Sequence, residues 1–381
     1  MVHPHDLWYD PWTIRPLALA RELQSMGHRV TLCHLPRKEK PQSPRIRQPE
    51  PGDPSVYELK PRQAHFIHNF RHLYELANDC DIIHLQKCFA SVALPVLWVS
   101  RLLKKPLHYD WDDNETALAK QVEKRRLSRY QLEVYETMLP RFAHSLTYSS
   151  QWIQNRAVEL GYPKEKTFHL PVGADVERFH PQCEKATALL QQWGLNPRCQ
   201  TVLYIGQMEG AAHAHLLIDA APKVLQHFPN TQFLLVGGGE QLEDVRQTAY
   251  ASPARETIFL PGYVEQNMVP AIIAASDICV ACFEDDEATR AKSPLKIAEY
   301  LASGKAIVAS LVGEAPYMIG SCGKPVEAGS SAAIADGILY YLQNKEKRAQ
   351  DGCLARLQAE RHFNWRYGAK TLLQAYQSCL F

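Results

Sequence analysis

The order of the expected elements along the chain constrains its fold more than any single motif does. Short apolar runs, typical of buried strands, alternate with amphipathic helical segments over nearly the whole length. This alternation indicates parallel sheets with helices on both faces. It occurs in two arrays, and 381 residues are enough for two domains of ordinary size. The sequence therefore predicts two doubly wound, Rossmann-like α/β domains.

The first array begins with a helix over residues 15–27, which a glycine ends, and continues with a strand over residues 29–33. Only Met1 to His5 are left for the strand that should precede this helix. That strand is therefore either very short or starts before Met1. Residues 36–61 are rich in proline and polar side chains and predict a long loop. Further strands are expected at residues 81–85, 106–110, 145–148, 167–170, 201–205, 232–236, 257–260, 278–283 and 307–309.

The composition argues against several classes of protein. The formal net charge is +1, whereas a nucleic-acid-binding domain is usually strongly basic. No segment approaches about 18 consecutive apolar residues, and the N-terminus lacks the charged and apolar regions of a signal peptide. The 10 cysteines show no paired framework, which favours free thiols in a reducing cytoplasm. Cys279 and Cys282 have CxxC spacing, but their apolar surroundings predict a buried strand rather than a redox or zinc site.

Residues 293–310 are the most informative stretch for function. Ser293 and Pro294 lie where a helix would start, and a glycine after the helix fits its C-terminal cap. A helix N-terminus favours a bound anion, because its first backbone N–H groups have no partner within the helix. Lys292 and Lys296 add positive charge at this position, so the segment predicts a phosphate site.

Two further polar groups support a ligand site. Glu299, one turn inside the same helix, is placed to accept hydrogen bonds from a diol, and a diol acceptor beside phosphate donors indicates a nucleotide-sugar pocket. Asp110, Asp112 and Asp113 form a second group at the mouth of an expected strand, where clustered charge favours a functional site. The alternative in both places is a set of solvated charges. Neither a dinucleotide-binding G-x-G-x-x-G nor a Walker motif is present.

Taken together, these motifs resemble the retaining glycosyltransferases of family four, which have the two-domain GT-B fold. The resemblance covers essentially the whole chain, and the order and spacing of its motifs are more specific than any one of them. It implies an acceptor-binding domain over residues 1–180 that faces, across a cleft, a nucleotide-sugar-binding domain over residues 181–360. A last helix over residues 361–381 would cross back to the first domain. The matching segments are residues 15–23, 27–28, 81–84, 170–175, 179–181, 204–206, 233–237, 260–263 and 293–304.

The resemblance also implies which residues hold the donor. Glu299 matches the second glutamate of the family's Glu-x7-Glu motif, which accepts hydrogen bonds from the ribose hydroxyls. Ala291 replaces the first glutamate, so one of the acidic residues 284–287 is a candidate to contact the sugar. The family's arginine and lysine after the first strand of the second domain are missing, which makes Lys296 the first choice to balance the phosphate charge. The other candidates for the donor site, including two more cations, are Arg290, Lys292, Ser293, Pro294, Leu295, Gly206, Gln207, Gly237, Gly238, Tyr263 and Val264.

In the first domain, Asp110, Asp112 and Asp113 are expected to be catalytic, because family members often carry a histidine or an acid at this strand end. His84, at the end of the preceding strand, either faces the same edge or is a satisfied core histidine. The Asp-x-Asp pattern also occurs in metal-dependent transferases of another fold, but GT-B enzymes usually need no metal. We therefore expect neither a metal nor another cofactor. The implied mechanism retains the anomeric configuration, and the leaving phosphate takes the acceptor proton.

The implied partners are a nucleotide-sugar donor and a glycan or lipid-linked acceptor used in polysaccharide or glycoconjugate biosynthesis, with no nucleic acid. We expect a cytoplasmic protein, peripheral on the inner face of the cell membrane if its basic residues share one surface. Otherwise those residues are simply solvated. Two alternatives stay open, namely a non-catalytic homologue that serves as a scaffold and a sugar-nucleotide epimerase of the same fold. The basic residues are Arg37, Lys38, Lys40, Arg45, Arg47, Arg62, Arg71, Lys120, Lys124, Arg125, Arg126 and Arg129.

Overall fold

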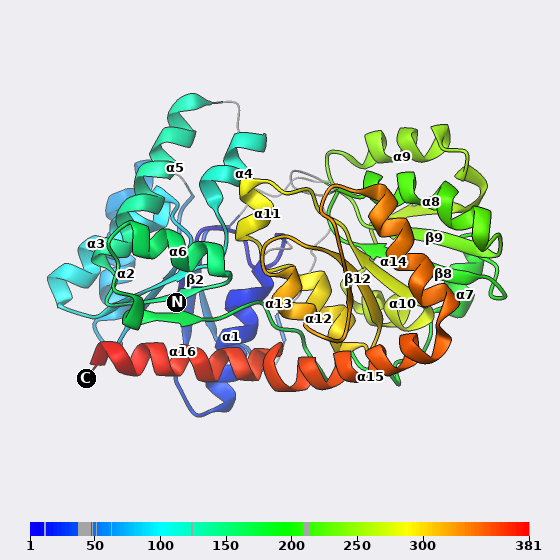
Figure 1. Ribbon diagram of the computed structural model, residues 1–381. Coiled ribbons are helices and arrows are strands. Elements are labelled where there is room, and N and C mark those ends of the chain that lie inside the picture. The colour runs from blue at the N-terminus through cyan, green and yellow to red at the C-terminus, as the bar shows by residue number, and fades with distance from the viewer. Residues whose placement is uncertain are drawn as a thin grey trace. The chain divides into compact units, whose positions relative to one another are not determined.

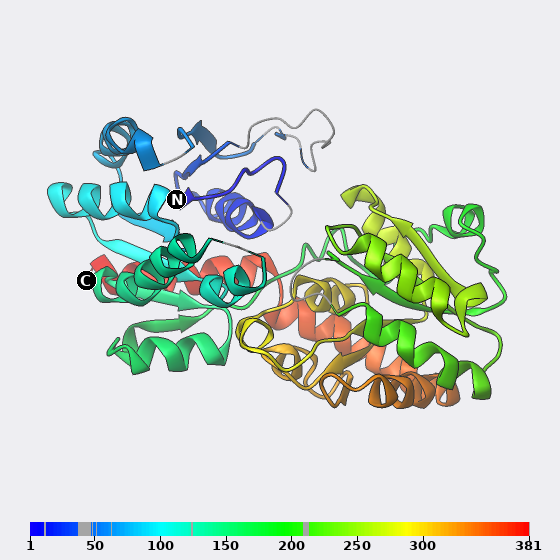
Figure 2. The same cartoon turned by 90° about the horizontal axis from the view of Figure 1, so that it is seen from above.

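The computed structural model describes residues 1–10, 13–36, 47, 49–50, 52–61, 63–122, 125–208 and 213–380. Its contacts divide the chain into two compact units, which are described separately (Figure 1 and Figure 2). Unit 1 comprises Met1–Pro171, Ala291–Ser293 and Trp365–Phe381, and unit 2 comprises Val172–Arg290 and Pro294–Asn364. The last helix of the chain therefore belongs to the same unit as the first strand.

Within the described residues, unit 1 contains a seven-stranded sheet in the order β3-β2-β1-β4-β5-β6-β7, and every pair of neighbours is parallel. The first strand has two residues yet lies inside the sheet, because Val2 pairs with both Cys33 and Leu85. Strand β3 lies in the segment expected to be a loop, so that expectation is wrong at these four residues. The strands are β1 (Val2–His3), β2 (Thr31–His34), β3 (Ser55–Glu58), β4 (Ile83–Gln86), β5 (Leu107–Trp111), β6 (Ser145–Tyr148) and β7 (Thr167–His169).

Helices cover both faces of this sheet. On one face, α16 packs along α1 and against β5, β6 and β7, and its buried residues recur every three or four positions, as one apolar stripe requires. On the other face, α2, α3 and α6 close the main apolar cluster of the unit. The helices are α1 (Ile14–Ser25), α2 (Phe66–Ala77), α3 (Ala90–Leu103), α4 (Glu115–Val122), α5 (Arg126–Met138), α6 (Gln151–Glu159) and α16 (Trp365–Leu380).

Unit 2 contains a six-stranded parallel sheet among the described residues, in the order β10-β9-β8-β11-β12-β13. Its central strands are almost entirely apolar, as expected for strands that are buried on both faces. The two parallel α/β units confirm the predicted fold class. The strands are β8 (Gln200–Ile205), β9 (Thr231–Val236), β10 (Ile258–Gly262), β11 (Ile278–Ala281), β12 (Ala306–Ser310) and β13 (Lys324–Val326).

The helices of unit 2 include the one that carries the expected donor motif. This helix, α12, begins at Leu295 with Pro294 as its N-cap and ends at Ala302, close to the expected bounds. The Gly304 that follows has a φ of +64°, the left-handed conformation of a C-terminal cap. The helices are α7 (Thr187–Gln192), α8 (His215–His227), α9 (Leu242–Ala251), α10 (Val269–Ala275), α11 (Glu287–Ala291), α12 (Leu295–Ala302), α13 (Ala315–Ile319), α14 (Ser331–Gln343) and α15 (Lys345–His362).

Candidate functional site

Each sheet has one point at which its strand order reverses, and doubly wound sheets bind ligands at the carboxyl ends of the strands beside that point. It lies between β1 and β4 in unit 1, and between β8 and β11 in unit 2. Polar residues follow the strands at both points. The first group, residues 86–87 and 111–115, is called the unit 1 edge. The second, residues 204–208, 237–239 and 296–300, is called the unit 2 edge.

Asp110, expected to be catalytic, is instead the buried partner of an arginine. Arg15 on α1 donates from Nε and Nη2 to the two carboxylate oxygens at 2.8 Å each, and Thr147 donates to the same carboxylate at 2.8 Å. Burial alone would raise the pKa of Asp110, but the Arg15 guanidinium holds it well below its usual range. Asp110 is 0% exposed, and the pair ties α1 to β5 inside unit 1. This burial does not favour the expected catalytic role, which stays a prediction.

His84 lies on the same buried side of the sheet. Its Nδ1 is hydrogen-bonded to the hydroxyl of Tyr376 on α16 at 2.8 Å. Next to it, the ring nitrogens of His108 are hydrogen-bonded to Ser145 and Thr147 at 2.8 and 2.9 Å. Burial lowers the pKa of both histidines, that of His108 to about 4. His84 is buried, but within the described residues its Nε2 has no hydrogen-bond partner, so only half of the ring is satisfied. Its burial fits a core histidine, and the catalytic role stays a prediction.

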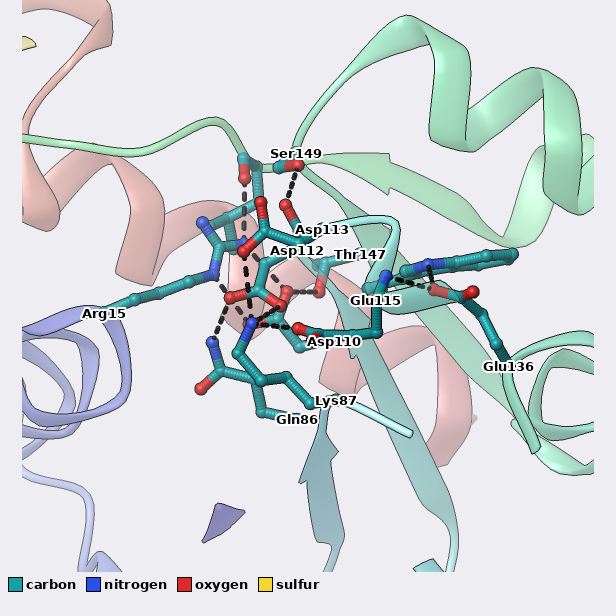
Figure 3. Close-up of polar contacts among 12 residues, drawn as sticks. Arg15, Gln86, Lys87, Asp110, Asp112, Asp113, Glu115, Glu136, Thr147 and Ser149 are labelled. Atoms are coloured by element: carbon teal, nitrogen blue, oxygen red, sulfur yellow. Dashed lines mark hydrogen bonds and ion pairs between the residues drawn. The ribbon is translucent and has the colours of Figure 1, made fainter. Parts of the chain in front are cut away.

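Asp112 and Asp113 lie beyond the end of β5, around a lysine that sequence analysis missed (Figure 3). Lys87 Nζ is 3.3 Å from Asp112 Oδ1 and 3.1 Å from Asp113 Oδ2, and it also contacts the carboxylate of Glu115. Lys87 is 4% exposed and has a φ of +65°, a left-handed conformation that is uncommon for lysine. One signal could have identified it. Lys87 follows β4 as Asp112 follows β5, and these neighbouring parallel strands end at the same edge.

This cluster contains one cation for three carboxylates. Burial would lower the pKa of Lys87, but the surrounding carboxylates raise it well above its usual value, so the lysine stays charged. Burial raises the pKa of Asp112, and that of Glu115 to about 7. One ligand atom from each of Asp112, Asp113 and Glu115 lies within 4.8 Å of the others, a spacing that could hold a cation. The Lys87 ammonium already supplies positive charge to all three.

Hydrogen bonds from two other segments fix the loop that carries these acids. Gln86 Nε2 donates to Asp112 Oδ2 at 2.7 Å, next to the lysine. Glu136 on α5 accepts from the backbone N–H groups of Glu115 and Thr116 at 2.8 and 3.1 Å. The side chain of Asp113 stays 26% exposed, against 10% for Asp112. Asp113 is therefore the acid of the unit 1 edge that is best placed to meet a ligand.

Lys296 lies across the end of β8 in unit 2, as expected for a cation of the donor site. Its Nζ is 3.7 Å from the centre of the Tyr204 ring and 5.7 Å from that of Phe283, distances at which a cation is attracted to the ring face. A Cβ at Gly206 would lie 2.8 Å from this Nζ. Gly206 also has a φ of +150°, which side chains rarely allow. The glycine and the lysine thus form one arrangement, in which a side chain at position 206 would displace the amine.

The glycines after β9 close the same edge. A Cβ at Gly237 would lie 1.7 Å from the carbonyl oxygen of Gly206, so the two backbones are in direct contact. The carbonyl of Gly238 accepts from the N–H of Met208 at 2.8 Å, and a Cβ at Gly238 would lie 3.4 Å from Cβ of Tyr263. Tyr263 is 53% exposed. The structure therefore brings together the glycines and the tyrosine that were expected at the donor site.

Helix α12 carries two more of the expected residues. Lys296 and Glu299 are three positions apart and therefore lie on one face of the helix, and Glu299 is 8% exposed. The hydroxyl of Tyr300 accepts from the N–H of Ile205 at 2.9 Å, which fixes α12 to β8. At the start of the helix, Pro294 is buried and Leu295 is half-buried. After β8, the backbone carbonyl of Gln207 accepts a hydrogen bond from the Tyr204 hydroxyl at 3.4 Å. The half-buried Val264 follows β10.

Three expected residues do not join this group. Arg290 donates to both carboxylate oxygens of Asp285, at 2.6 and 3.0 Å, on an exposed surface. Lys292 and Ser293 belong to unit 1. The expectation that these residues share the donor site with Lys296 is therefore not supported by their placement. Ala291, where the family has its first glutamate, is 0% exposed and lies in the apolar cluster of unit 1.

Two histidines near the unit 2 edge were not expected. His213 Nδ1 accepts from the backbone N–H of Glu284 at 3.3 Å, and His215 Nε2 lies 3.5 Å from the Glu284 carboxylate. His213 precedes α8, and His215 is its first residue. Both follow the segment after β8 in which the arginine and lysine typical of the family are missing. Their position between a strand end and a helix start is the signal that could have identified them. Glu284, in the acidic run 284–287, thus contacts both histidines at the start of α8.

The remaining sequence expectations concern cysteines, membrane spans and charge. All 10 cysteines lie in the described residues and are free, and Cys279 and Cys282 are buried at β11, which confirms the core interpretation. Among the described residues, every helix is too short or too polar to cross a bilayer. Of the basic residues, Arg37, Lys38, Lys40, Arg45, Arg62 and Lys124 lie outside the described residues.

Two family profiles match the sequence, one in each half. The profile described as Glycosyltransferase Family 4 matches residues 16–178, and the profile described as Glycosyl transferases group 1 matches residues 199–344. Among curated relatives, a GDP-mannose-dependent alpha-(1-6)-phosphatidylinositol monomannoside mannosyltransferase of Mycolicibacterium smegmatis is 26% identical over 242 residues. That match covers 62% of this chain and 63% of the relative, less than two thirds of its length. Spore coat protein SA of Bacillus subtilis is 22% identical over 330 residues, which cover 82% of this chain and 84% of that protein.

Solved structures are similar over nearly the whole chain. Anabaena HepE in complex with UDP-glucose has a TM-score of 0.76 at 18% identity, with 99% of each chain covered. A glycosyltransferase from Rickettsia africae has a TM-score of 0.75 at 15% identity, with 100% of this chain and 97% of that chain covered. These likenesses support the GT-B fold for the two parallel units described above.

Proposed function

This chain belongs to glycosyltransferase family 4, and we propose that it transfers a sugar from a nucleotide-diphosphate sugar to a saccharide or lipid-linked acceptor. The mannosyltransferase relative is named for a GDP-mannose donor and a phosphatidylinositol mannoside acceptor, which supports these two substrate classes. The solved structure bound to UDP-glucose also supports a nucleotide-sugar donor. We propose that the transfer retains the anomeric configuration and serves glycoconjugate biosynthesis.

The observation that carries this proposal is the placement of Lys296 across Gly206 at the unit 2 edge. As the donor bond breaks, negative charge develops on the leaving diphosphate, and fixed donors stabilise that charge more than flexible ones do. The Tyr204 ring lies under the amine at the end of β8, and the lack of a side chain at Gly206 leaves room for the amine there. Lys296 is accordingly the residue that we assign to the diphosphate, and Glu299 on the same helix face is assigned to the ribose hydroxyls.

We assign the unit 1 edge to the sugar and acceptor hydroxyls. The side chain of Asp113 is 26% exposed, and the ammonium of Lys87 contacts the carboxylates of both Asp113 and Asp112 and so fixes their positions. A carboxylate fixed in this way accepts a hydrogen bond from a hydroxyl without a large loss of its own freedom. Asp112 is the less exposed of the two and positions Asp113 through their shared contact with Lys87. The roles expected for Asp110 and His84 stay predictions.

The chemistry needs no protein nucleophile in this proposal. The acceptor hydroxyl attacks the anomeric carbon on the face from which the diphosphate leaves, and its proton passes to the leaving phosphate oxygen. Lys296 stabilises the phosphate charge throughout, and the carboxylates orient hydroxyl groups. We propose that neither a metal nor another cofactor takes part, because Lys87 and Lys296 supply the positive charge at the two edges.

For a lipid-linked acceptor, the protein would work at the inner face of the cell membrane as a peripheral, cytoplasmic enzyme. The exposed Arg71, Lys120, Arg125 and Arg126 of unit 1 support this part of the proposal, because cations near an anionic surface each favour binding by about 1 kcal/mol. These cations favour the lipid-linked one of the two proposed acceptor classes.

Calorimetric titration with UDP, GDP and ADP tests the proposal directly. We expect one of the three to bind, and mass spectrometry of the nucleotide released from a panel of donor sugars then identifies the sugar. The absence of binding to any of them would contradict transfer and favour a non-catalytic homologue. Turnover of a nucleotide sugar without an acceptor and without release of the nucleotide would indicate an epimerase instead.

A further inference from the structure

Glu284 follows β11 at the point where the strand order of the unit 2 sheet reverses. Its side chain is 50% exposed, and the two carboxylate oxygens lie beside two histidines at the start of α8. Oε1 is 3.5 Å from Nε2 of His215, and Oε2 is 4.0 Å from Nε2 of His213. Because β8 and β11 are neighbours and α8 follows β8, the three residues lie at the carboxyl ends of adjoining strands.

Hydrogen bonds from three segments fix the turn that carries this carboxylate. The backbone N–H of Glu284 donates to Nδ1 of His213 at 3.3 Å, and its carbonyl accepts from the hydroxyl of Thr289 on α11 at 2.6 Å. The backbone N–H of Phe283, the residue before it, donates to Oγ of Ser310 on β12 at 2.9 Å. The side chain of Glu284 is therefore presented from a backbone that is held in place.

The hydrogen bond to His213 also determines where that ring carries its proton. Because Nδ1 accepts from a backbone N–H, the proton of the neutral ring lies on Nε2. Nε2 is the nitrogen that faces Oε2 of Glu284. His213 thus accepts from the backbone of Glu284 and turns its own N–H toward the carboxylate, which makes it a positioning residue for this acid.

The same turn lies beside the amine of Lys296. The centre of the Phe283 ring is 5.7 Å from Lys296 Nζ. Cys282, the next residue back, donates from Sγ to the carbonyl oxygen of His213 at 3.2 Å, so the histidine and the turn pack together. In a nucleotide-diphosphate sugar, the sugar is bonded directly to the terminal phosphate. A diphosphate at Lys296 would therefore bring its sugar to the end of β11, where Glu284 lies.

The neighbouring acids of the run are engaged with α11. Asp285 accepts from Arg290 on α11 with both carboxylate oxygens. Asp286 accepts from a backbone N–H of that helix at 2.8 Å, and Glu287 is the first helical residue. Glu284 is accordingly the acid of the run that belongs to the strand end.

We infer that Glu284 accepts hydrogen bonds from two neighbouring hydroxyl groups of the transferred sugar, with His213 as its positioning residue. The two oxygens of a carboxylate accept strong, charge-assisted hydrogen bonds, so the group suits a pair of adjacent hydroxyls. Four acids were candidates for this contact, because Ala291 replaces the first glutamate of the motif, and the geometry favours one of them. The inference rests on the proposed function and adds an acid that belongs to the same unit as Lys296.

Calorimetric titration of the full chain with UDP, GDP and ADP, and with UDP-glucose, GDP-mannose and ADP-glucose, tests this role. Glu284→Gln keeps the size of the side chain and removes its charge. We expect this variant to bind the nucleoside diphosphate like the wild type and the matching nucleotide sugar about 10-fold or more weakly, as for a lost hydrogen bond to a charged group. Glu256→Gln makes the same change at a side chain that is 86% exposed before β10, and it should leave both affinities unchanged.

Two variants of His213 test its positioning role. Asparagine can offer an acceptor near the place of Nδ1, whereas leucine cannot. We expect His213→Leu to weaken binding of the nucleotide sugar by about 2- to 12-fold, the range of one neutral hydrogen bond, with the nucleoside diphosphate unaffected. His213→Asn should restore the wild-type affinity. Equal losses in both variants would contradict positioning through the Glu284 N–H.

Three results would overturn the assignment of Glu284. Equal affinities of Glu284→Gln and the wild type for the nucleotide sugar would remove the residue from the sugar site. A parallel loss of affinity for the nucleoside diphosphate would mean that the change acts on the diphosphate site or the fold. Rejection of all three nucleotide sugars by a wild type that binds a nucleoside diphosphate would exclude a diol reader, because glucose and mannose share the hydroxyls at C3 and C4. Only the absence of nucleoside diphosphate binding would contradict the proposed function itself.

Discussion

Replacement of Lys296 by methionine tests the donor site most directly. Methionine keeps most of the side-chain volume and removes only the charge and its hydrogen bonds. A hydrogen bond that involves a charged group contributes about 1.5–3 kcal/mol, which corresponds to an affinity change of about 10- to 150-fold. We therefore expect Lys296→Met to weaken binding of the nucleoside diphosphate by that factor in calorimetric titration, and to weaken binding of the nucleoside itself much less.

The structure offers a matched control for this change. Lys324 Nζ lies 4.8 Å from the centre of the Tyr340 ring, so it too is a lysine over a tyrosine, but on β13. Both methionine variants lose a cation–π contact of about 0.5–1 kcal/mol, which should lower the free energy of unfolding alike. Only Lys296→Met should lose affinity for the diphosphate. Equal diphosphate affinities of Lys296→Met and the wild type would refute the assignment of this residue, and with it the observation on which the proposed function depends.

Three further outcomes are expected. Lys87→Met leaves buried carboxylates without their cation and should lower the free energy of unfolding in urea by about 3–5 kcal/mol. The loss should be smaller at pH 5 than at pH 8, because Glu115, whose pKa is raised to about 7, is protonated at pH 5. Equal losses at both pH values would contradict the charge argument. Since the pKa of His108 is lowered to about 4, the unfolded state binds more protons than the folded state between about pH 4 and 6.5. Stability should therefore rise with pH across that window by up to about 3 kcal/mol, and an unchanged urea profile in His108→Gln would refute this. Gly206→Ala should weaken diphosphate binding, because the added methyl group displaces the amine of Lys296. In calorimetric titration, the variant that combines it with Lys296→Met should lose less affinity than the sum of the two single losses. Additive losses of affinity would mean that the two residues act independently.

The fold could be predicted because its signal is local. Apolar runs of four to six residues alternate with amphipathic helices, and both periodicities are visible within one element. The expected and observed strands differ by a few residues at their ends. Sequence analysis missed two edge strands, the three-residue β13 and the four-residue β3, whose burial pattern is mostly exposed. Among the described residues β3 pairs with β2 alone, and β13 with β12 alone, so neither a long apolar run nor a second neighbour marks them.

The contacts of Asp110 and His84 could not be predicted, because they depend on helices far away in the sequence. Both strands are buried on both faces, so alternation does not tell which face meets a ligand. Tyr376 on α16 contacts His84 across 292 positions of sequence, and Arg15 on α1 contacts Asp110 across 95. Only the packing of these two helices shows that this face is closed.

The placement of most expected donor residues could be predicted, because strand ends and helix starts set it, whereas their role in donor binding stays a prediction. Lys296 is placed by the first turn of α12, and Gly206 by the end of β8, both of which the sequence predicts. One bond that joins these two elements, from the N–H of Ile205 to the hydroxyl of the buried Tyr300, has no sequence signal. Local patterns thus supplied the candidates, whereas the contacts between their elements became visible only in the structure.

The burial of Ala291 bears on the role that we propose for Lys296 of the unit 2 edge. The side chain of Ala291 is 0% exposed among the apolar residues of unit 1, and an unpaired carboxylate there would cost at least several kcal/mol. An apolar side chain therefore suits these surroundings, and the first glutamate of the Glu-x7-Glu motif that the chain resembles would be unpaired at this position. Residues 291–293 belong to unit 1, whereas Lys296 and Glu299 belong to unit 2. Under the proposed function, the motif then contributes two donor-binding residues on one helix face, of which Lys296 carries the positive charge.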